Sequence, residues 1–465
     1  MADRHAQRQC GRTAGPVCAT LPDVSVIGPG APSGWRGRLR VLRMDLTPLR
    51  RYRDFRLLFS ASVVSLFGSL VTEVAAPLQM KQLTNSYVAV GLIGIAEFVP
   101  LMVCGLWGGA IADAHDRRRV VLVATCVELL MSATLMGNAL LAHPHVWVIY
   151  TAAAGAAAAT AMRRPSQDAM EARLVPYEDQ PAANALSGLE FNGSAILAPA
   201  IGGVLAAYSM PLAYGVDVTT FVVALLLLVR VAPVPPGEAA ERVSFAGIWA
   251  GIRYAAGRKE LLGTYFVDIV AMAFAMPEAL FPFLADQLGH PDALGLLYSA
   301  GAVGAIVTTL TSGWTSRVHR HGLAIVLAGG GWGLGMACAG VAPNLWTVLC
   351  CLAFAGGADM LSGVFRGTVW NQTIPDDLRG RLAGIELLSY SSGPAVGNAR
   401  AGLMAQAGGV RFSIGVGGLL CMGGVALTAL LMPSFLRYDD RTDPHAVQQR
   451  ARRAQSDAAA RNLSA

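Results

Sequence analysis

Charge is the scarcest property of this sequence. Only 14% of its 465 residues are charged and 54% are hydrophobic, whereas about 25% of an average soluble protein is charged. The 36 basic and 30 acidic residues are too few to give the several soluble domains that this length would allow a polar surface. An ordinary soluble enzyme is therefore excluded, and most of the surface must face lipid.

Three further absences narrow the function. The sequence has no CxxC pair or Cys/His cluster, so it predicts no metal, no disulfide framework and no cofactor. No glycine run is followed by Gly-Lys-Ser/Thr, which excludes a built-in ATPase and leaves an ion gradient as the energy source. The net charge of +6 comes from bases scattered between apolar runs, so nucleic acid is not an expected partner.

Long apolar runs dominate the sequence. Each is long enough to cross about 30 Å of hydrocarbon as a helix, the element that satisfies its own backbone in lipid. We predict an all-α membrane protein with twelve transmembrane helices in two six-helix bundles. The expected spans are 55–80, 88–112, 120–142, 146–162, 183–208, 211–230, 261–285, 293–315, 322–342, 344–365, 382–405 and 412–435.

Composition also predicts the domain boundaries. The Arg-, Gly- and Pro-rich start lacks the apolar core of a secretory signal, and composition changes abruptly at Met44, a candidate for the true start. Residues near 245–252 place apolar side chains on one helical face, which predicts an amphipathic helix on the membrane surface. The expected parts are a disordered tail 1–45, a bundle 46–231, a linker 232–260, a bundle 261–436 and a disordered tail 437–465.

Basic residues predict the orientation. They gather in the even-numbered loops, which we take to be cytoplasmic because cytoplasmic loops are enriched in Lys and Arg. The opposite loops offer little beyond Lys81 and Arg411. We therefore expect a monomeric protein of the bacterial inner membrane with both termini in the cytoplasm. The supporting arginines include Arg117, Arg163, Arg164, Arg173, Arg317 and Arg366.

The two halves repeat each other. Gly91-Leu92 corresponds to Gly295-Leu296 at an offset of 204, and Ala198-Pro199 parallels Gly393-Pro394. Duplicated halves of the same orientation are typical of secondary transporters with a binding site at the bilayer midplane.

One loop carries a family motif. Residues 108–119 read GGAIADAHDRRR, which resembles motif A of the major facilitator superfamily, with Ala114 and Asp116 departing from it. The resemblance implies that the carboxylate and the arginines latch a cytoplasmic gate. A second loop, 374–381, resembles the branch of siderophore exporters and macrolide efflux pumps. The gate residues are Gly109, Asp113, Asp116, Arg117, Arg118, Arg119, Arg379, Gly380 and Arg381.

The fifth span carries a second motif. Its sequence APAIGG at 198–203 resembles motif C of exporters, in which Pro199 kinks the helix while Gly202 and Gly203 let a neighbour approach. The alternative is an ordinary proline kink with packing glycines.

Charges inside the spans predict the transport path. Each costs about 2.5 to 3.5 kcal/mol in lipid, so most should line a wet cavity. We favour Glu97, Glu190 and Asp268 as proton carriers because they lie nearest mid-helix; structural hydrogen bonds are the alternative. Arg400, with Asn398, would meet an anionic substrate group or else pair with Glu278 or another acid. The candidates are Glu73, Glu97, Glu190, Asp268, Glu278, Asp359 and Arg400.

Together these features predict a proton-coupled exporter of an amphipathic small molecule working by alternating access. A siderophore is the first candidate substrate, and a drug or antibiotic is the second. A lipid flippase, an uptake carrier and a membrane enzyme are weaker alternatives. Against the enzyme, Asp376-Asp377 is a single acidic pair with no second aspartate-rich site.

Overall fold

The computed structural model describes residues 45–234, 253–254, 257–374, 379–452 and 455, with the backbone alone for 106–114 and 379–390. Throughout these ranges the regular secondary structure is helical, without strands. The fold class predicted from the sequence is therefore confirmed as all-α. The predicted tail 1–45 and the amphipathic helix of the linker fall almost wholly outside the described residues and remain predictions.

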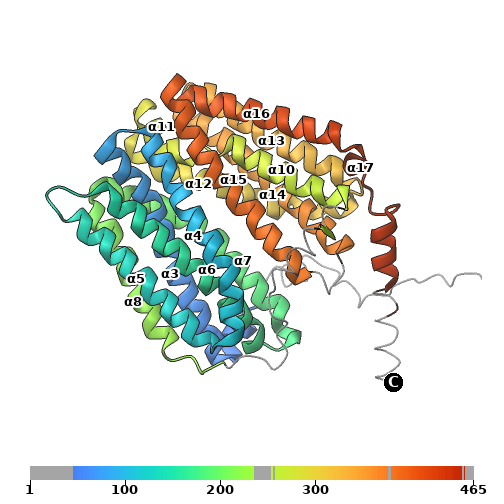
Figure 1. The fold of residues 1–465 in the computed structure, drawn as a ribbon, viewed down its shortest axis with the longest axis horizontal. Coiled ribbons are helices and arrows are strands. Elements are labelled where there is room, and N and C mark those ends of the chain that lie inside the picture. The colour runs from blue at the N-terminus through green and yellow to red at the C-terminus, as the bar shows by residue number, and fades with distance from the viewer. Residues whose placement is uncertain (1–44, 235–252, 255–256, 375–378, 453–454, 456–465) are drawn as a thin grey trace, which may run out of the picture. The chain divides into compact units, whose positions relative to one another are not determined.

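The helices fall into two sets. Figure 1 shows the first set in blue to green and the second in yellow to red. The first set is α2 (Thr47–Arg51), α3 (Arg53–Thr84), α4 (Tyr87–Ala114), α5 (Arg117–Ala139), α6 (Val146–Leu174), η1 (Tyr177–Asp179), α7 (Gln180–Tyr208) and α8 (Met210–Leu228). The second set is α10 (Lys259–Ala275), η2 (Glu278–Leu280), α11 (Phe281–Gln287), η3 (Pro291–Ala293), α12 (Leu294–Thr311), η4 (Ser312–Arg317), α13 (His321–Val341), α14 (Leu345–Thr373), α15 (Arg379–Gly408), α16 (Val410–Leu431) and α17 (Pro433–Leu436).

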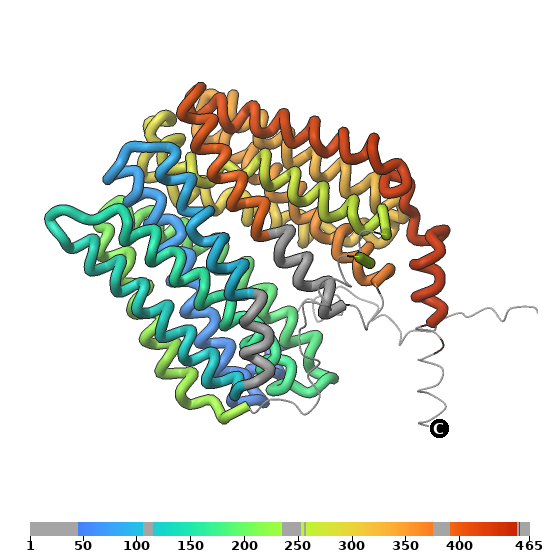
Figure 2. The backbone as a smooth tube through the Cα atoms, in the orientation of Figure 1, coloured from blue at the N-terminus to red at the C-terminus, as the bar shows by residue number. Residues whose placement is uncertain are grey.

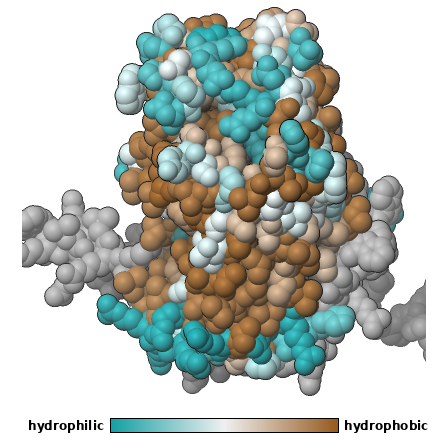
Figure 3. Space-filling view, turned by 90° about the vertical axis from the view of Figure 1, so that its left-hand side faces the viewer, coloured by the Kyte–Doolittle hydropathy of each residue, from teal (hydrophilic) through white to brown (hydrophobic). Residues whose placement is uncertain are grey.

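Ten helical segments in the described part of the chain are long and apolar enough to cross a membrane. The helices α6 and α15 are also long, at 29 and 30 residues, but are more polar. If both cross, the total equals the predicted twelve, which stays a prediction. Figure 3 shows a broad hydrophobic area on one face, with hydrophilic residues gathered towards its upper and lower edges, as lipid contact requires.

Local signals explain several helix boundaries. The Asp116 carboxylate accepts a hydrogen bond of 2.9 Å from the backbone N–H of Arg118 and so caps the start of α5. Asn344 caps α14 in the same way through the N–H of Thr347, at 3.0 Å. Asn85, with φ of 46°, ends α3 in the left-handed conformation that asparagine tolerates well.

The structure corrects one predicted span. The segment 261–285 is not a single helix, because α10 ends at Ala275 and the chain continues through η2 into the short α11. Proline explains the break: Pro277 precedes η2 and Pro282 lies in the first turn of α11, and proline cannot donate the backbone bond that a continuous helix needs.

The structure also moves several predicted loop arginines into helices. The helix α6 continues to Leu174 rather than ending near 162, so Arg163, Arg164 and Arg173 are helical. Arg366 lies inside α14 and is buried. Arg366 is therefore not a loop anchor, and the topology argument rests on the remaining arginines.

The predicted disordered tail 437–465 is partly ordered. Residues 444–452 are helical, and Ala446 is only 2% exposed. Asp440 contacts His319 twice, through its carboxylate to the ring Nδ1 at 3.0 Å and through its N–H to the carbonyl at 3.2 Å. Tyr438 packs on the ring of His321, and burial raises the pKa of its phenol above the usual value. Apolar packing thus extends past the last long helix.

Candidate functional site

The repeated glycines form equivalent contacts between the two helix sets. Gly91 on α4 packs against α15, and Gly295 on α12 packs against α7. A Cβ at Gly91 would lie 2.6 Å from the carbonyl oxygen of Asn398, and one at Gly295 would lie 2.4 Å from that of Pro199. Glycine is required because a side chain would force these helices apart. The crossing of α4 and α15 can be followed in Figure 2. We call this glycine-lined region the joined end.

The predicted exporter motif lies at the joined end. A Cβ at Gly202 would come within 3.0 Å of the Cα of Val71 on α3, and one at Gly203 within 2.4 Å of the backbone nitrogen of Gly295. The motif therefore packs against α3 of its own half and α12 of the other half. Ser299 adds a hydrogen bond of 2.8 Å from α12 to the carbonyl of Ile196 on α7.

Three predicted carboxylates influence one another across the two halves. Glu73 on α3, Glu97 on α4 and Glu278 on η2 interact electrostatically with one another, and each also influences Tyr298 on α12. Because Glu278 belongs to the second half, these carboxylates face the space between the halves rather than lipid. Glu73 and Glu97 are nevertheless exposed, so this space admits water. We call Glu73, Glu97 and Glu278 the acidic cluster.

Two hydrogen bonds hold η2 in place beside the acidic cluster. The Tyr298 hydroxyl donates to the backbone carbonyl of Glu278 at 3.0 Å. The side-chain oxygen of Asn398 on α15 accepts from the N–H of Ala279 at 3.0 Å. Asn398 was expected to meet substrate together with Arg400; in the structure it positions the turn that carries Glu278.

Glu190 belongs to a separate polar chain within the first half. It accepts a hydrogen bond from the Ser62 hydroxyl, which in turn accepts one of 2.9 Å from Gln167. Arg163 donates to Gln167 and lies 3.1 Å from the carboxylate of Glu128. The chain links α3, α5, α6 and α7, which is the structural hydrogen bonding named as the alternative to proton transport for Glu190.

Asp268 is neutralised by a neighbouring arginine. Its carboxylate, only 4% exposed, forms an ion pair with Arg366 of α14. Arg366 also lies 3.8 Å from Asp359, whose side chain is 39% exposed. Proton uptake by Asp268 would have to compete with this buried ion pair, which makes it a weaker candidate for a proton carrier than the acidic cluster.

Arg400 contacts groups outside the acidic cluster. Its guanidinium contacts the Met404 sulfur at 3.0 Å and the carbonyl of Ser413 at 3.5 Å. A Cβ at Gly417 on α16 would lie 2.8 Å from the guanidinium, which confirms that Arg400 packs on α16. Among the residues whose side chains are described, no ion pair of Arg400 with Glu278 is found.

The motif A loop is anchored within its own half. Arg118 donates to the carbonyls of Leu228 and Val229, the first at 3.4 Å, at the end of α8. The N–H of Arg117 donates to the carbonyl of Val234 at 3.2 Å. Arg119 is exposed. The side chains of Gly109, Asp113, Arg379, Gly380 and Arg381 lie outside the described residues, so the predicted latch remains a prediction.

Sequence reasoning missed one charged contact. Lys81, counted above as a minor exception among loop charges, forms an ion pair with Asp286 of α11 in the other half. A repeat signal was available: residues 72–82 read TEVAAPLQMKQ and residues 277–287 read PEALFPFLADQ, with Glu, Pro and Gln in register.

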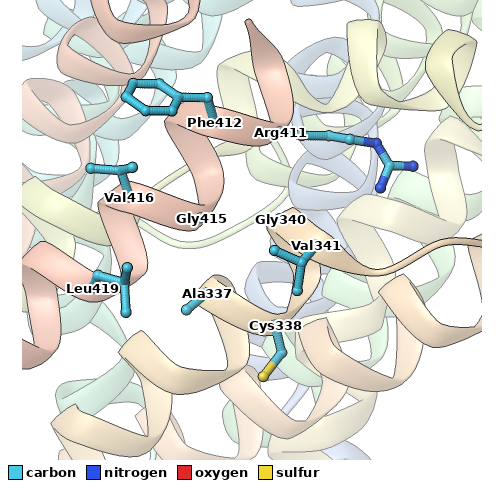
Figure 4. Close-up of a pocket in the computed structure, with 9 residues that line it drawn as sticks. All are labelled: Ala337, Cys338, Gly340, Val341, Arg411, Phe412, Gly415, Val416 and Leu419. Carbon is cyan, nitrogen blue, oxygen red and sulfur yellow. The ribbon is translucent and has the colours of Figure 1, made fainter. Parts of the chain in front are cut away.

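An apolar groove of about 490 Å³ lies elsewhere, between α13 and α16. Figure 4 shows small and aliphatic side chains around it together with the ring of Phe412, while the guanidinium of Arg411 points away. That guanidinium donates to the carbonyl of Ala342. The groove contains none of the carboxylates described above. Its lining residues are Ala337, Cys338, Gly340, Val341, Arg411, Phe412, Gly415, Val416 and Leu419.

Comparison with known proteins gives a consistent result. Residues 44–454 match the sequence profile of a family described as transmembrane secretion effectors. The chain is 30% identical over 412 residues to the enterobactin exporter EntS of Escherichia coli K12, covering 86% of this chain and 97% of that protein. It is also 30% identical over 368 residues to the enterobactin exporter EntS of Shigella boydii, covering 77% of this chain and 87% of that protein.

Solved structures share the fold at low identity. A bacterial homologue of the human lysosomal transporter Spinster, inward-facing and unoccupied, gives a TM-score of 0.67 at 15% identity, covering 85% of this chain and 99% of that one. An inward-facing bacterial homologue of the iron transporter ferroportin gives a TM-score of 0.59 at 15% identity, covering 83% of this chain and 98% of that one.

Proposed function

Because this chain belongs to the transmembrane secretion effectors of the major facilitator superfamily, we propose that it exports a siderophore in exchange for protons. It is a multi-pass membrane transporter rather than an enzyme. The single observation that carries the substrate class is its 30% identity to an enterobactin exporter across 97% of that protein. Substrates vary within one fold, so the substrate itself must be tested.

The proposed location is the bacterial inner membrane, with both termini in the cytoplasm and the protein acting as a monomer. Support comes from the arginines beside the motif A loop, which lie at the opposite end of α4 from Gly91. In this orientation the joined end faces outwards. With the joined end in contact, we then expect the transport path to open towards the cytoplasm, where an exporter collects its substrate.

Alternating access requires the joined end to open after substrate binds. The glycine contacts of α4 with α15 and of α7 with α12 are the surfaces that must separate. They present backbone rather than interlocking side chains, so two rigid bundles can part there without unpacking their own interiors.

We assign proton coupling to the acidic cluster. Three carboxylates from two halves repel one another when ionised, and the repulsion persists in a partly hydrated space because its effective dielectric constant is lower than that of bulk water. Protons taken up from outside remove the repulsion and let the outer end close. Release of protons to the cytoplasm, as substrate binds, restores the repulsion and favours opening outwards.

A second candidate function is efflux of an amine-bearing antibiotic. The acidic cluster favours it, since a cationic amphipathic molecule would neutralise Glu73, Glu97 and Glu278 directly. Such a substrate would replace protons at the same carboxylates, which is the competition that an antiporter needs.

The deciding experiment measures extracellular siderophore under iron limitation. Cells lacking the gene should secrete less, wild-type protein should restore secretion, and Glu97→Gln should restore it poorly. Glu190→Gln is the matched control, because Glu190 lies in a polar chain confined to the first half. Normal secretion in the deletion strain, together with lost antibiotic tolerance, would replace the siderophore with a drug.

A further inference from the structure

The two halves carry the same short segment at the joined end. Glu73 corresponds to Glu278, Pro77 to Pro282 and Gln82 to Gln287, at a constant offset of 205 residues. One charged position breaks the pattern: where the first half has Lys81, the second half has Asp286. We call 73–82 and 278–287 the paired segments.

Equivalent positions of the paired segments meet in space. Glu73 interacts with Glu278, and Lys81 forms an ion pair with Asp286. Positions related by the pseudo-two-fold axis of duplicated halves come together where they lie on that axis. Identical acidic residues there repel each other, and Glu73 and Glu278 are such a like-charged pair. Because Lys81 and Asp286 carry opposite charges, they attract each other at the equivalent place.

Lys81 is held by more than its charge partner. Its ammonium donates to the carbonyl of Pro282 at 2.8 Å and lies 5.4 Å from the centre of the Phe283 ring. That ring lies 4.5 Å from the ring of Tyr87, the first residue of α4. The Lys81 side chain is 11% exposed, so it is well screened from water even though Asp286 is 53% exposed. These contacts all cross between the halves.

The break in α10 makes this contact possible. Because the helix stops before Pro277 and restarts at Phe281, α11 carries Asp286 and the Pro282 carbonyl to the end of α3. Lys81 is eight residues beyond Glu73 on α3, or about 12 Å along a helix axis. The ion pair therefore lies about two turns beyond the acidic cluster along α3, towards the end of the bundle.

We propose that Lys81 and Asp286 form the latch of the outer gate: they hold the joined end closed, and their separation is part of each transport cycle. They are positioning residues that set which side of the cavity is open, and they are not expected to touch substrate. This inference rests on the alternating access proposed above, but it requires neither a siderophore nor proton coupling.

The test exchanges the charges of Lys81 and Asp286 and measures the distance between spin labels on the two halves. Spin labels at His143→Cys and Pro343→Cys, in a chain whose native cysteines are replaced, report the separation of the two halves at the joined end, because both positions lie in loops there. In detergent without substrate, Lys81→Asp should enlarge the population with the longer distance about fivefold or more. The double variant Lys81→Asp with Asp286→Lys should return the distances close to those of the unaltered chain.

Two further variants keep the result interpretable. Lys81→Gln removes attraction without adding repulsion and should give a smaller shift in the same direction, which covers the case that Lys81→Asp fails to fold. Tyr150→Phe is the control, since the Tyr150 hydroxyl bonds to the carbonyl of Ala89 within the first half and touches neither labelled loop, and it should leave the distances unchanged. Unaltered distances in both Lys81 variants, or no recovery in the double swap, would overturn the latch. Lost export with unaltered distances would also count against it while leaving the proposed function standing.

Discussion

The two halves neutralise an arginine within the bundle in different ways. Arg163 on α6 and Arg366 on α14 stand 203 residues apart, at corresponding places in the repeat. Arg163 joins a polar chain across four helices that ends at Glu190, whereas Arg366 is held by two nearby acids, Asp268 and Asp359. Each half thus balances its own arginine internally. The acidic cluster between the halves receives no such arginine among the side chains described, which is why we propose it as the group that responds to protons.

The two loops at the other end follow one plan with different residues. The loop after α4 is bonded through Asp116 and Arg117 to Val234, in the segment after α8. The loop after α12 is bonded through His319 to Asp440, in the segment after α17. In both halves the segment that follows the sixth long helix fixes the loop between the second and third. This equivalence explains why part of the tail is ordered.

The largest difference between the halves should appear when the acid partner of each arginine is removed. Asp268→Ala leaves Arg366 buried beside Asp359 alone, and breaking such a pair costs about 3 to 5 kcal/mol. Glu128→Ala should cost less, because Arg163 is more exposed and keeps Gln167. Thermal unfolding in detergent gives the ranking. A larger loss of thermal stability for Glu128→Ala would show that Arg163 depends on its acid more than Arg366 does.

The glycine contacts should behave alike in both halves. Gly91→Val and Gly295→Val each place a side chain against a backbone carbonyl, which should disfavour the joined end by about 1 to 3 kcal/mol. Export should fall, and the spin-label distance should lengthen. Gly330→Val is the control because its Cβ would meet open space. An equal fall in export for Gly330→Val would remove close helix contact as the cause.

The acidic cluster should govern coupling and leave stability unchanged. Glu278→Gln and Glu97→Gln should each lower proton-driven transport in everted vesicles about tenfold, equivalent to about 1.4 kcal/mol. Glu190→Gln, within the first-half chain, should lower it less. Proton-driven transport that survives in Glu73→Gln, Glu97→Gln and Glu278→Gln together would exclude the cluster from coupling.

The smallest effects should come from the two loop anchors. Asp116→Ala removes a helix cap and a bond to Val234, at a cost of about 1 kcal/mol. Asp440→Ala removes a partly exposed contact with His319, worth about 0 to 1 kcal/mol. Unfolding midpoints of both variants in detergent would compare them. A greater loss for Asp440→Ala would mean that the tail stabilises the second half more than the linker stabilises the first.

Particular residues show how far sequence reasoning reached. Apolar length predicted the helices, since lipid leaves the backbone no other satisfactory partner, and the Gly91 and Gly295 repeats predicted equivalent positions that prove to be equivalent contacts. Three of the seven charged candidates, Glu73, Glu97 and Glu278, are brought together. Arg366 was wrongly assigned to a loop, because the sequence does not show that a buried acid, Asp268, pairs with it. The break after Ala275 was missed because proline in an apolar run also fits a kinked helix, as Pro77 does in α3.

The sequence by itself determined the medium, the helices and the duplicated plan, because these depend on local composition and on periodicities along one chain. Only the tertiary structure decided which charges neutralise each other within one half and which charges interact with their counterparts in the other half. Those choices depend on distances between residues from 35 to 205 positions apart in the sequence. Lys81 with Asp286 and Glu73 with Glu278 illustrate the reason: two copies of one segment meet, and a single change of sign separates attraction from repulsion.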